Sequence, residues 1–346
     1  MSGERRVGDL FAKLGPVLGL VLVWSAFAVG IGERFWSWDN GRLMLLQTSI
    51  VAIAAIGATL VIVAGMIDLA VGSAVALATV IVALLLEAGF GPWAAIVGGI
   101  GSIALTGAVV GAFVTGQVLG CIGLRTRAGR RIEVSPFVVT LAMWGALRGL
   151  AKGLGDNQPV YVTDATWLAK LVEASPSRGS LLADLSAFDL FAIAAPCVWV
   201  MLVLAIVVAI LLRATVFGRH VFAVGSNVET AHLCGIAVAR VKVMTFVIAG
   251  ACAGLAGTIQ FAYLGMGDPT TAAGLELRVI AAVVIGGASL TGGEGSIVGT
   301  LLGALLMTVV DNGCTKLGLP NWVQEIATGG IILVAVILDR IRHGER

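Results

Sequence analysis

Six ionisable side chains lie inside or beside apolar stretches, where such groups are costly to bury: Asp68, Arg148, Glu276, Arg278, Asp311 and Glu325. In that setting they hold ions, protons or polar solutes, or they satisfy backbone groups at a helix end. The sequence gives no sign of a catalytic or metal site, because it has no zinc-ligand spacing of Cys or His, no Gly-x-Ser-x-Gly and no His-Glu-x-x-His. It also has no Walker A pattern, so we expect no ATP and no other cofactor on this chain.

Asp68 stands in AGMIDLAVGSAVAL, between two apolar runs and flanked by Gly65 and Gly72. The glycines predict an irregular backbone at this point. Two interpretations remain open here. Asp68 caps a helix that begins at Leu69 and satisfies its free N–H groups, or it lies on a substrate path or gate.

Glu276 and Arg278 are two positions apart and do not share a helix face, so a local ion pair between them is not expected. Asp311 and Asn312 end an apolar stretch, where they would reach outer water. Position and polarity single out Asp68, Glu276 and Asn312 as candidates for a substrate pathway or gate.

The composition indicates which elements must position these groups. Hydrophobic residues make up 58% of the 346 residues and charged residues only 12%, against about 25% charged in a soluble domain. A membrane-spanning helix needs about 20 apolar residues. Apolar stretches fall at ten places, some of them short or interrupted by glycine: 14–31, 43–64, 69–86, 93–119, 136–151, 188–212, 243–264, 275–289, 296–311 and 321–338. The sequence therefore predicts an all-α polytopic membrane protein with about ten transmembrane helices in a single domain, 1–346.

The basic residues are sorted between the connecting segments. With ten spans, fourteen of the 22 Lys and Arg residues lie in the segments on the side of the N-terminus and six on the other side. Cytoplasmic segments carry the excess of Lys and Arg, so we expect both termini in the cytoplasm. The net charge of +2 argues against nucleic acid as a partner.

Two connecting segments are long. The outer one, about 152–187, contains TDATWLAKLVEA (163–174), a predicted helix with Asp164 as its cap. One face of this helix carries Trp167, Leu168, Leu171 and Val172. This helix either lies on the bilayer or docks an external protein. The inner segment, about 213–242, is basic and contains a predicted short helix with Asn227 as its cap and Gly235 as its terminator.

Glycine is abundant, and four small-x-x-x-small pairs (Gly107/Gly111, Gly116/Gly120, Gly250/Gly254 and Gly299/Gly303) predict close helix packing. A chain of buried carboxylates and histidines, which proton- or ion-coupled transporters use, is missing. This favours energy delivered from outside the chain.

Four segments carry a resemblance to a known family: GMIDLAVGSAVALA (65–78), SPFVVTLAMWGALRGLA (135–151), FGRHVFAVGSNVETAHLCGIAVARVK (217–242) and AAGLELRVIAAVVIGGASLTGGEGSIVGTLLGALL (272–306). In this order they resemble the membrane permeases of bacterial ABC importers for monosaccharides such as ribose, xylose, arabinose and galactose. The resemblance implies a fold of the vitamin-B12-importer type, a second permease copy, a cytoplasmic ABC ATPase that carries the ATP and Mg²⁺, and a periplasmic sugar-binding protein.

The resemblance also implies a short coupling helix that contacts the ATPase. The family pattern is Glu-Ala-Ala followed by a glycine. This chain has Glu229, Thr230 and Ala231 followed by Gly235, so a threonine replaces the middle alanine. With Asn227 as cap and His232 on the same turn, these residues are the expected ATPase contact.

A second departure from the family is the basic segment GLRTRAGRRIEV (123–134), which binds anionic lipid or contacts the ATPase. The expected function is that of a multi-pass inner-membrane permease that imports a monosaccharide by alternating access and is itself no enzyme. A branched-chain amino acid or nucleoside permease, and an ion-coupled secondary transporter, are the alternatives.

Overall fold

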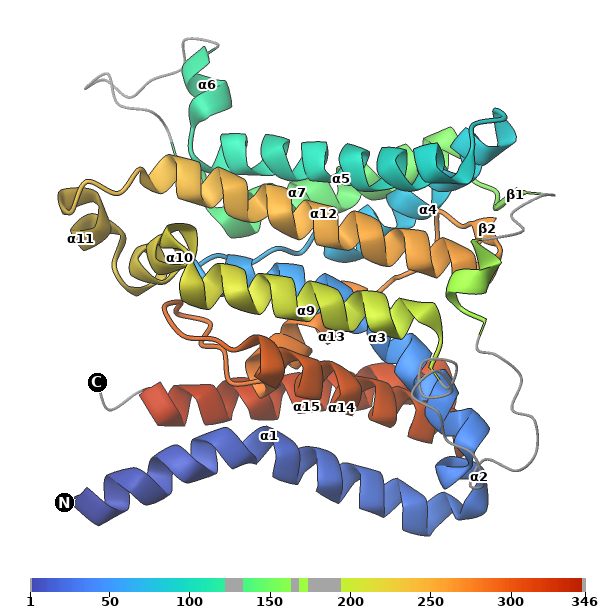
Figure 1. Cartoon of the computed structure of the whole chain (residues 1–346), viewed down its shortest axis with the longest axis horizontal. Coiled ribbons are helices and arrows are strands. Elements are labelled where there is room, and N and C mark those ends of the chain that lie inside the picture. The colour runs from blue at the N-terminus through green and yellow to red at the C-terminus, as the bar shows by residue number, and fades with distance from the viewer. Residues whose placement is uncertain (1, 122–132, 163–167, 174–193, 344–346) are drawn as a thin grey trace.

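The computed structural model describes residues 2–121, 133–162, 168–173 and 194–343. Helices dominate these residues (Figure 1). The longer ones are α1 (Ser2–Ile31), α3 (Trp38–Val63), α4 (Val71–Glu87), α5 (Pro92–Val114), α7 (Pro136–Leu154), α9 (Pro196–Ala214), α10 (Val216–Ser226), α12 (Val238–Leu264), α13 (Leu275–Ile285), α14 (Ile297–Lys316) and α15 (Asn321–His343). Short elements are α2 (Glu33–Trp36), α6 (Gln117–Cys121), α11 (Val228–Leu233), a 3-10 turn η1 (Ala169–Leu171), and the antiparallel strands β1 (Val160–Tyr161) and β2 (Met266–Gly267).

Every predicted apolar stretch overlaps a helix, which confirms an all-α polytopic membrane protein at this level. In the described part of the chain, six helices are long and apolar enough to cross a membrane, namely α3, α5, α7, α9, α12 and α14. Shorter apolar helices lie at Gly15–Ile31, Val71–Glu87 and Asn321–Ile337. The stretch 93–119 is divided, because α5 ends at Val114 and the chain turns at Gly116 with φ 64° before α6.

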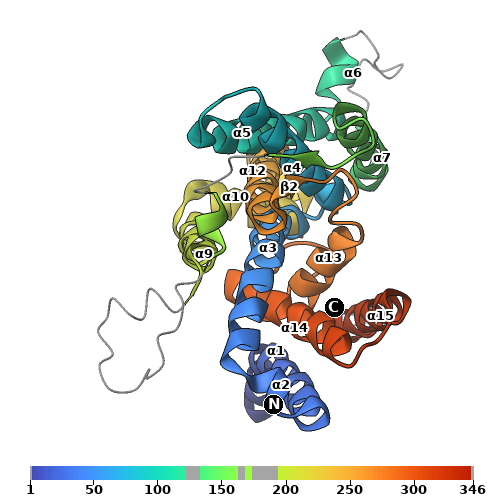
Figure 2. The same cartoon turned by 90° about the vertical axis from the view of Figure 1, so that its right-hand side faces the viewer.

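Helix α3 lies at the centre of the molecule (Figure 2). It is the most buried of the long apolar helices, with 89% of its apolar window inside the protein. Helices α5, α12, α4 and α7 lie on one side of it and α13, α14 and α15 on the other, with α1 beyond α14 (Figure 2).

Three of the four predicted glycine pairs pack helices closely, whereas Gly116 lies in the turn between α5 and α6, so the pair Gly116/Gly120 does not lie on one helix. A Cβ placed on Gly107 of α5 would meet the carbonyl of Phe246 in α12, and one on Gly250 of α12 would meet the carbonyl of Ile103 in α5. The pair in α14 lies in the same way against the backbone of α13. Backbones this close gain dispersion contacts that larger residues would prevent.

Helices α3, α4 and α5 form a structural unit that recurs as α12, α13 and α14. The second unit runs in the opposite direction to the first. The chain enters α3 at the end of the molecule where α2 lies, and it enters α12 at the opposite end, beside α10 and α11 (Figure 1). Each long helix is followed by a non-helical segment, 64–70 and 265–274, and then by a shorter helix. We call these two the extended segments, although the second consists of β2 followed by turns. Interrupted helices in inverted repeats are typical of transporters and place irregular backbone inside the protein.

Two expectations about the outer loop change. The predicted helix at 163–174 is not formed in its described part, where residues 169–171 make one 3-10 turn. Leu168 there is fully buried and packs among Val82, Ala95 and Phe261, so this face contacts protein. Asp164, Trp167 and most of the basic segment 123–134 lie outside the described residues.

Candidate functional site

The predicted short helix in the segment 213–242 is present as α11, directly after α10. Asn227 has extended backbone angles, and its side-chain Oδ1 accepts a hydrogen bond of 2.8 Å from the N–H of Thr230. Asparagine is among the best N-cap residues because its side chain replaces a missing helical acceptor. The predicted cap is therefore confirmed.

Gly235 ends α11 in the left-handed conformation, with φ 79°. Its N–H donates to the carbonyl of His232, and the N–H of Ile236 donates to the carbonyl of Ala231. This pair of bonds is a Schellman motif, whose left-handed position favours glycine. The predicted terminator is confirmed as well.

The surface of α11 is almost entirely free of contacts within the chain. Ala231 is its one buried residue, while Glu229, Thr230 and His232 are exposed. Val228 and Leu233 are 43% and 89% exposed. A short, capped helix with exposed apolar side chains has the properties of a docking element.

Close backbone contacts connect α10 to the end of α3 and to the loop 286–296 after α13. A Cβ on Gly225, near the end of α10, would meet the carbonyl of Val63 and the amide nitrogen of Gly293. The N–H of Gly293 donates to the carbonyl of Val63 over 2.8 Å. The end of α3 and the loop 286–296 after α13 therefore meet at the helix that leads into α11.

Asp68 lies in the extended segment 64–70, as the flanking glycines predict. Its Oδ1 accepts a 2.8 Å hydrogen bond from the N–H of Ala70. The expectation that the helix begins at Leu69 is wrong, because α4 begins at Val71 after the N-cap Ala70. Asp68 thus satisfies the free N–H of the cap residue.

Glu276 lies in the first turn of α13, which follows Gly274 at φ 75°. Its carboxylate packs against Gly72 in the first turn of α4, where a Cβ would collide with it. The structure therefore brings the beginnings of the two shorter helices together at one of the predicted pathway residues.

Arg278 pairs with α14: its Nη1 lies 2.9 Å from Oδ2 of Asp311. The expectation that Glu276 and Arg278 do not pair locally agrees with this. The expectation that Asp311 and Asn312 reach outer water is wrong, because α14 continues to Lys316 and Asn312 is 5% exposed. Asn312 instead pairs with Asn40 of α3.

Helix α7 contacts both extended segments through side-chain hydrogen bonds to backbone carbonyls. Thr140 Oγ1 donates to the carbonyl of Ile67 over 3.2 Å. The guanidinium of Arg148 donates to the carbonyls of Pro269 and Thr271 over 3.0 and 2.6 Å. Unwound backbone inside a membrane protein needs such partners because lipid offers none.

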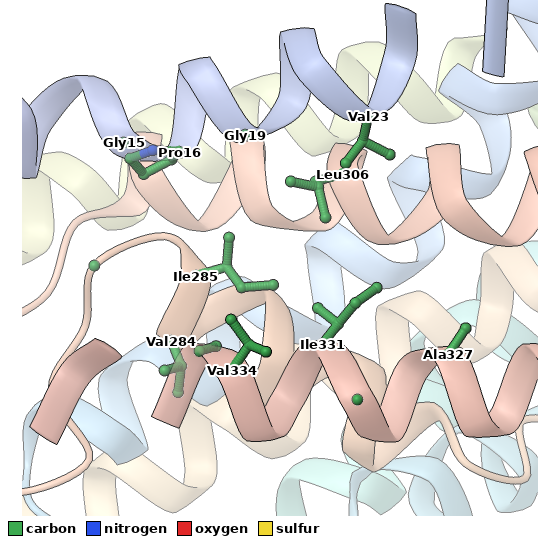
Figure 3. Close-up of a pocket in the computed structure, with 13 residues that line it drawn as sticks. Gly15, Pro16, Gly19, Val23, Val284, Ile285, Leu306, Ala327, Ile331 and Val334 are labelled. Atoms are coloured by element: carbon green, nitrogen blue, oxygen red, sulfur yellow. The ribbon is translucent and has the colours of Figure 1, made fainter. Parts of the chain in front are cut away.

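A cavity of about 550 Å³ lies between α1, the end of α13, α14 and α15. Figure 3 shows Val23, Leu306 and Ile331 pointing into it from three of these helices. The side chains around it carry no hydrogen-bonding group, so it cannot bind a polar solute specifically. In the described residues no three His, Cys, Asp or Glu side chains gather to hold a metal.

Comparison with known proteins identifies the family of this chain. Residues 43–336 match the family model described as the permease component of the branched-chain amino acid transport system. The chain belongs to this permease family. The L-arabinose ABC transporter permease of Azospirillum brasilense is 32% identical over 98% of this chain and 91% of its own length. The ribose import permeases of Bacillus subtilis and Escherichia coli are 36% and 35% identical, over 95% and 98% of this chain and 92% and 97% of theirs. No solved structure matches significantly.

The permease has functional geometry that sequence reasoning missed. Arg148 was only noted as a charge within a span, and its target is backbone carbonyls, which leave no trace in residue spacing. The sequence GMGDPTTAAG (265–274) could have indicated this contact. Its three glycines and one proline interrupt an apolar pattern and predict unwound backbone, which needs hydrogen-bond donors.

Proposed function

We propose that this permease is the membrane subunit of an ATP-driven importer that carries a monosaccharide across the inner membrane by alternating access. The observation that carries the proposal is the near full-length similarity to permeases named for arabinose, ribose and xylose. The exposed helix α11 supports it, together with the close backbone contacts that α10 makes with the end of α3 and the loop 286–296. A transporter driven by a separate motor needs a rigid contact on the motor's side.

The motor is a cytoplasmic ABC ATPase, which binds ATP and Mg²⁺ and hydrolyses ATP, so the permease itself is no enzyme. We assign its contact to α11, with Asn227 and Gly235 holding the helix in shape and Glu229, Thr230 and His232 facing the ATPase. Ala231, the buried member of the set, attaches α11 to the permease. A ligand shifts a two-state equilibrium only if it prefers one state, so the ATPase and the binding protein each prefer a different state.

Further features of the importer are proposed from the family. They are a periplasmic sugar-binding protein, a second permease copy, ten spans and a fold of the vitamin-B12-importer type. We place both termini in the cytoplasm, because α1 begins and α15 ends at the end of the molecule where α10 and α11 lie (Figure 1) and the basic residues favour that side.

We propose that the sugar passes the extended segments, with Asp68 and Glu276 beside its path. The positions of Asp68 and Glu276 support this proposal, because both residues lie where helices are interrupted. Transporters bind substrate at such interruptions. For Asn312, whose amide is fully paired with Asn40, we propose a part in closing the outer end of the path.

The family model's description supports a second candidate, a permease for branched-chain amino acids, and nucleosides belong to the same alternative. An ion-coupled secondary transporter is disfavoured, because the described residues of the spans form no relay of carboxylates and histidines.

The test is reconstitution of the permease in vesicles with the ATPase and binding protein encoded with it. We expect uptake of ribose, arabinose or xylose that requires ATP and both partners. Uptake of leucine instead would favour the second candidate, and uptake by the permease alone under an ion gradient would contradict an ATP-driven importer.

A further inference from the structure

The first turns of α4 and α13 face one another inside the protein. Gly72 in α4 packs against both the carboxylate of Glu276 and the carbonyl of Ala272, so closely that a Cβ on Gly72 would collide with them. The two helices are the matching short helices of the inverted repeat. Their N-terminal ends therefore meet, and each end carries the positive pole of a helix dipole.

This junction contains hydrogen-bonding groups without partners. The first helical bond of α4 runs from the N–H of Ala74 to the carbonyl of Ala70, which leaves the N–H groups of Val71, Gly72 and Ser73 without a helical acceptor. The Oγ of Ser73, a residue with no exposed surface, has no hydrogen-bond partner, and neither has the buried Oε2 of Glu276. Buried polar atoms are nearly always paired, so each exception requires an explanation.

The backbone beside the junction is strained. Ala272 has φ 57°, in the left-handed region that side chains with a Cβ adopt rarely. Strain of this kind persists where the surroundings enforce it, and it concentrates at ligand sites. The enforcing contact is Arg148, which binds the carbonyls of Pro269 and Thr271 just before Ala272.

Arg148 also contributes a positive charge close to the junction. It interacts electrostatically with Glu276 and with Asp268, while its hydrogen bonds go to the two carbonyls. The Glu276 carboxylate thus lies near a guanidinium and two helix N-terminal ends, and its Oε2 keeps its capacity to accept a hydrogen bond. Such a junction matches an uncharged ligand that both donates and accepts hydrogen bonds.

We propose that the first turns of α4 and α13 form a sugar-binding station on the proposed path, which takes a pair of neighbouring hydroxyl groups. One hydroxyl donates to Oε2 of Glu276, and its neighbour accepts from Ser73 Oγ or from the free N–H groups of α4. The proposal rests on the proposed import of a monosaccharide. The contact between Gly72 and Glu276 leaves no room for a sugar, so the two turns separate when the station is occupied and close behind the sugar when it leaves.

The experiment measures two quantities in vesicles that hold the complete transporter: ribose, arabinose or xylose imported per ATP hydrolysed, and ATP hydrolysis stimulated by the loaded binding protein. For Glu276→Gln we expect sugar per ATP to fall about tenfold, since a hydrogen bond to a charged group is lost, while stimulated hydrolysis stays within about twofold of the parent. Glu87→Gln, at the exposed far end of α4, is the matched control and should change neither quantity.

Ser73→Ala is the second variant and should lower sugar per ATP by about threefold, as expected for one neutral hydrogen bond. An unchanged ratio in both variants overturns the station. A parallel loss of stimulated hydrolysis, or of assembled transporter, in both variants also overturns it, because the residues are then structural. If the parent transporter imports none of the three sugars with ATP, the proposed function itself fails, which is a separate result.

Discussion

Asn40 and Asn312 exchange two hydrogen bonds, each of 3.0 Å, between the beginning of α3 and the last turns of α14. Both amides are buried, and Asn40 donates a second time to the carbonyl of Phe35. At the other end of the same two helices Thr59 and Thr300 form a hydroxyl pair of 2.8 Å. Two polar pairs thus fix the register of α3 against α14 across the apolar interface.

Replacing one partner of the amide pair should cost more stability than replacing both. We expect Asn312→Ala to lower the free energy of unfolding by about 1–3 kcal/mol, because the amide of Asn40 stays buried without its partner. The double variant Asn40→Leu with Asn312→Leu should lose less than the sum of the two single leucine variants. Thermal unfolding of the purified permease measures both, with the exposed Asn321→Ala as control. Additive losses would show that the amides do not act as a pair.

Gly225 should not tolerate a methyl group. We expect Gly225→Ala to destabilise the permease by about 1–3 kcal/mol, because the new Cβ overlaps the carbonyl of Val63 and the backbone of Gly293. ATP-driven uptake should fall with it, since the same contacts connect α10 to the end of α3 and to the loop 286–296. Gly41→Ala is the matched control: it lies in α3, has open space around it, and should gain up to about 1 kcal/mol from helix propensity. Equal stability of the two variants would remove the argument for a tight junction.

Glu229→Lys should separate ATP hydrolysis from transport. The side chain is exposed in the first turn of α11, so the change costs at most about 1 kcal/mol through the helix dipole and leaves the fold intact. We expect sugar uptake in the reconstituted transporter to fall at least about tenfold if the residue faces the ATPase, because a reversed charge across an interface repels its partner. Glu173→Lys, exposed far from α11, controls for charge alone. Unaltered uptake would exclude α11 as the coupling helix.

Much of the fold could be predicted, because the signals are local. Apolar stretches locate the helices, and the cap Asn227 and terminator Gly235 define α11 from side-chain and backbone preferences that act within four residues. The glycines around Asp68 correctly indicated unwound backbone. The first helical residue of α4 was misplaced by two positions, because Asp68 bonds the cap residue rather than occupying the cap itself.

The pairings within the site could not be predicted, because they join residues distant in the sequence. Helical spacing excludes a local partner for Arg278, but only the packing of α13 on α14 provides Asp311. Asn312 was expected in water because its apolar stretch ends there, and a partner on α3 keeps it buried instead. Contacts to backbone atoms, such as those of Arg148, depend on no particular residue at the other end.

Hydrogen bonds to backbone carbonyls leave the residue that supplies the carbonyl free to vary among related chains. Thr140 and Arg148 hold the extended segments by carbonyl oxygens, which every amino acid supplies. Ile67 and Thr271 can therefore be exchanged without removing an acceptor, whereas the two donors on α7 have few substitutes. A saturation mutagenesis screen for sugar uptake should find the permissive positions in the unwound backbone and the restricted ones on the helix beside it.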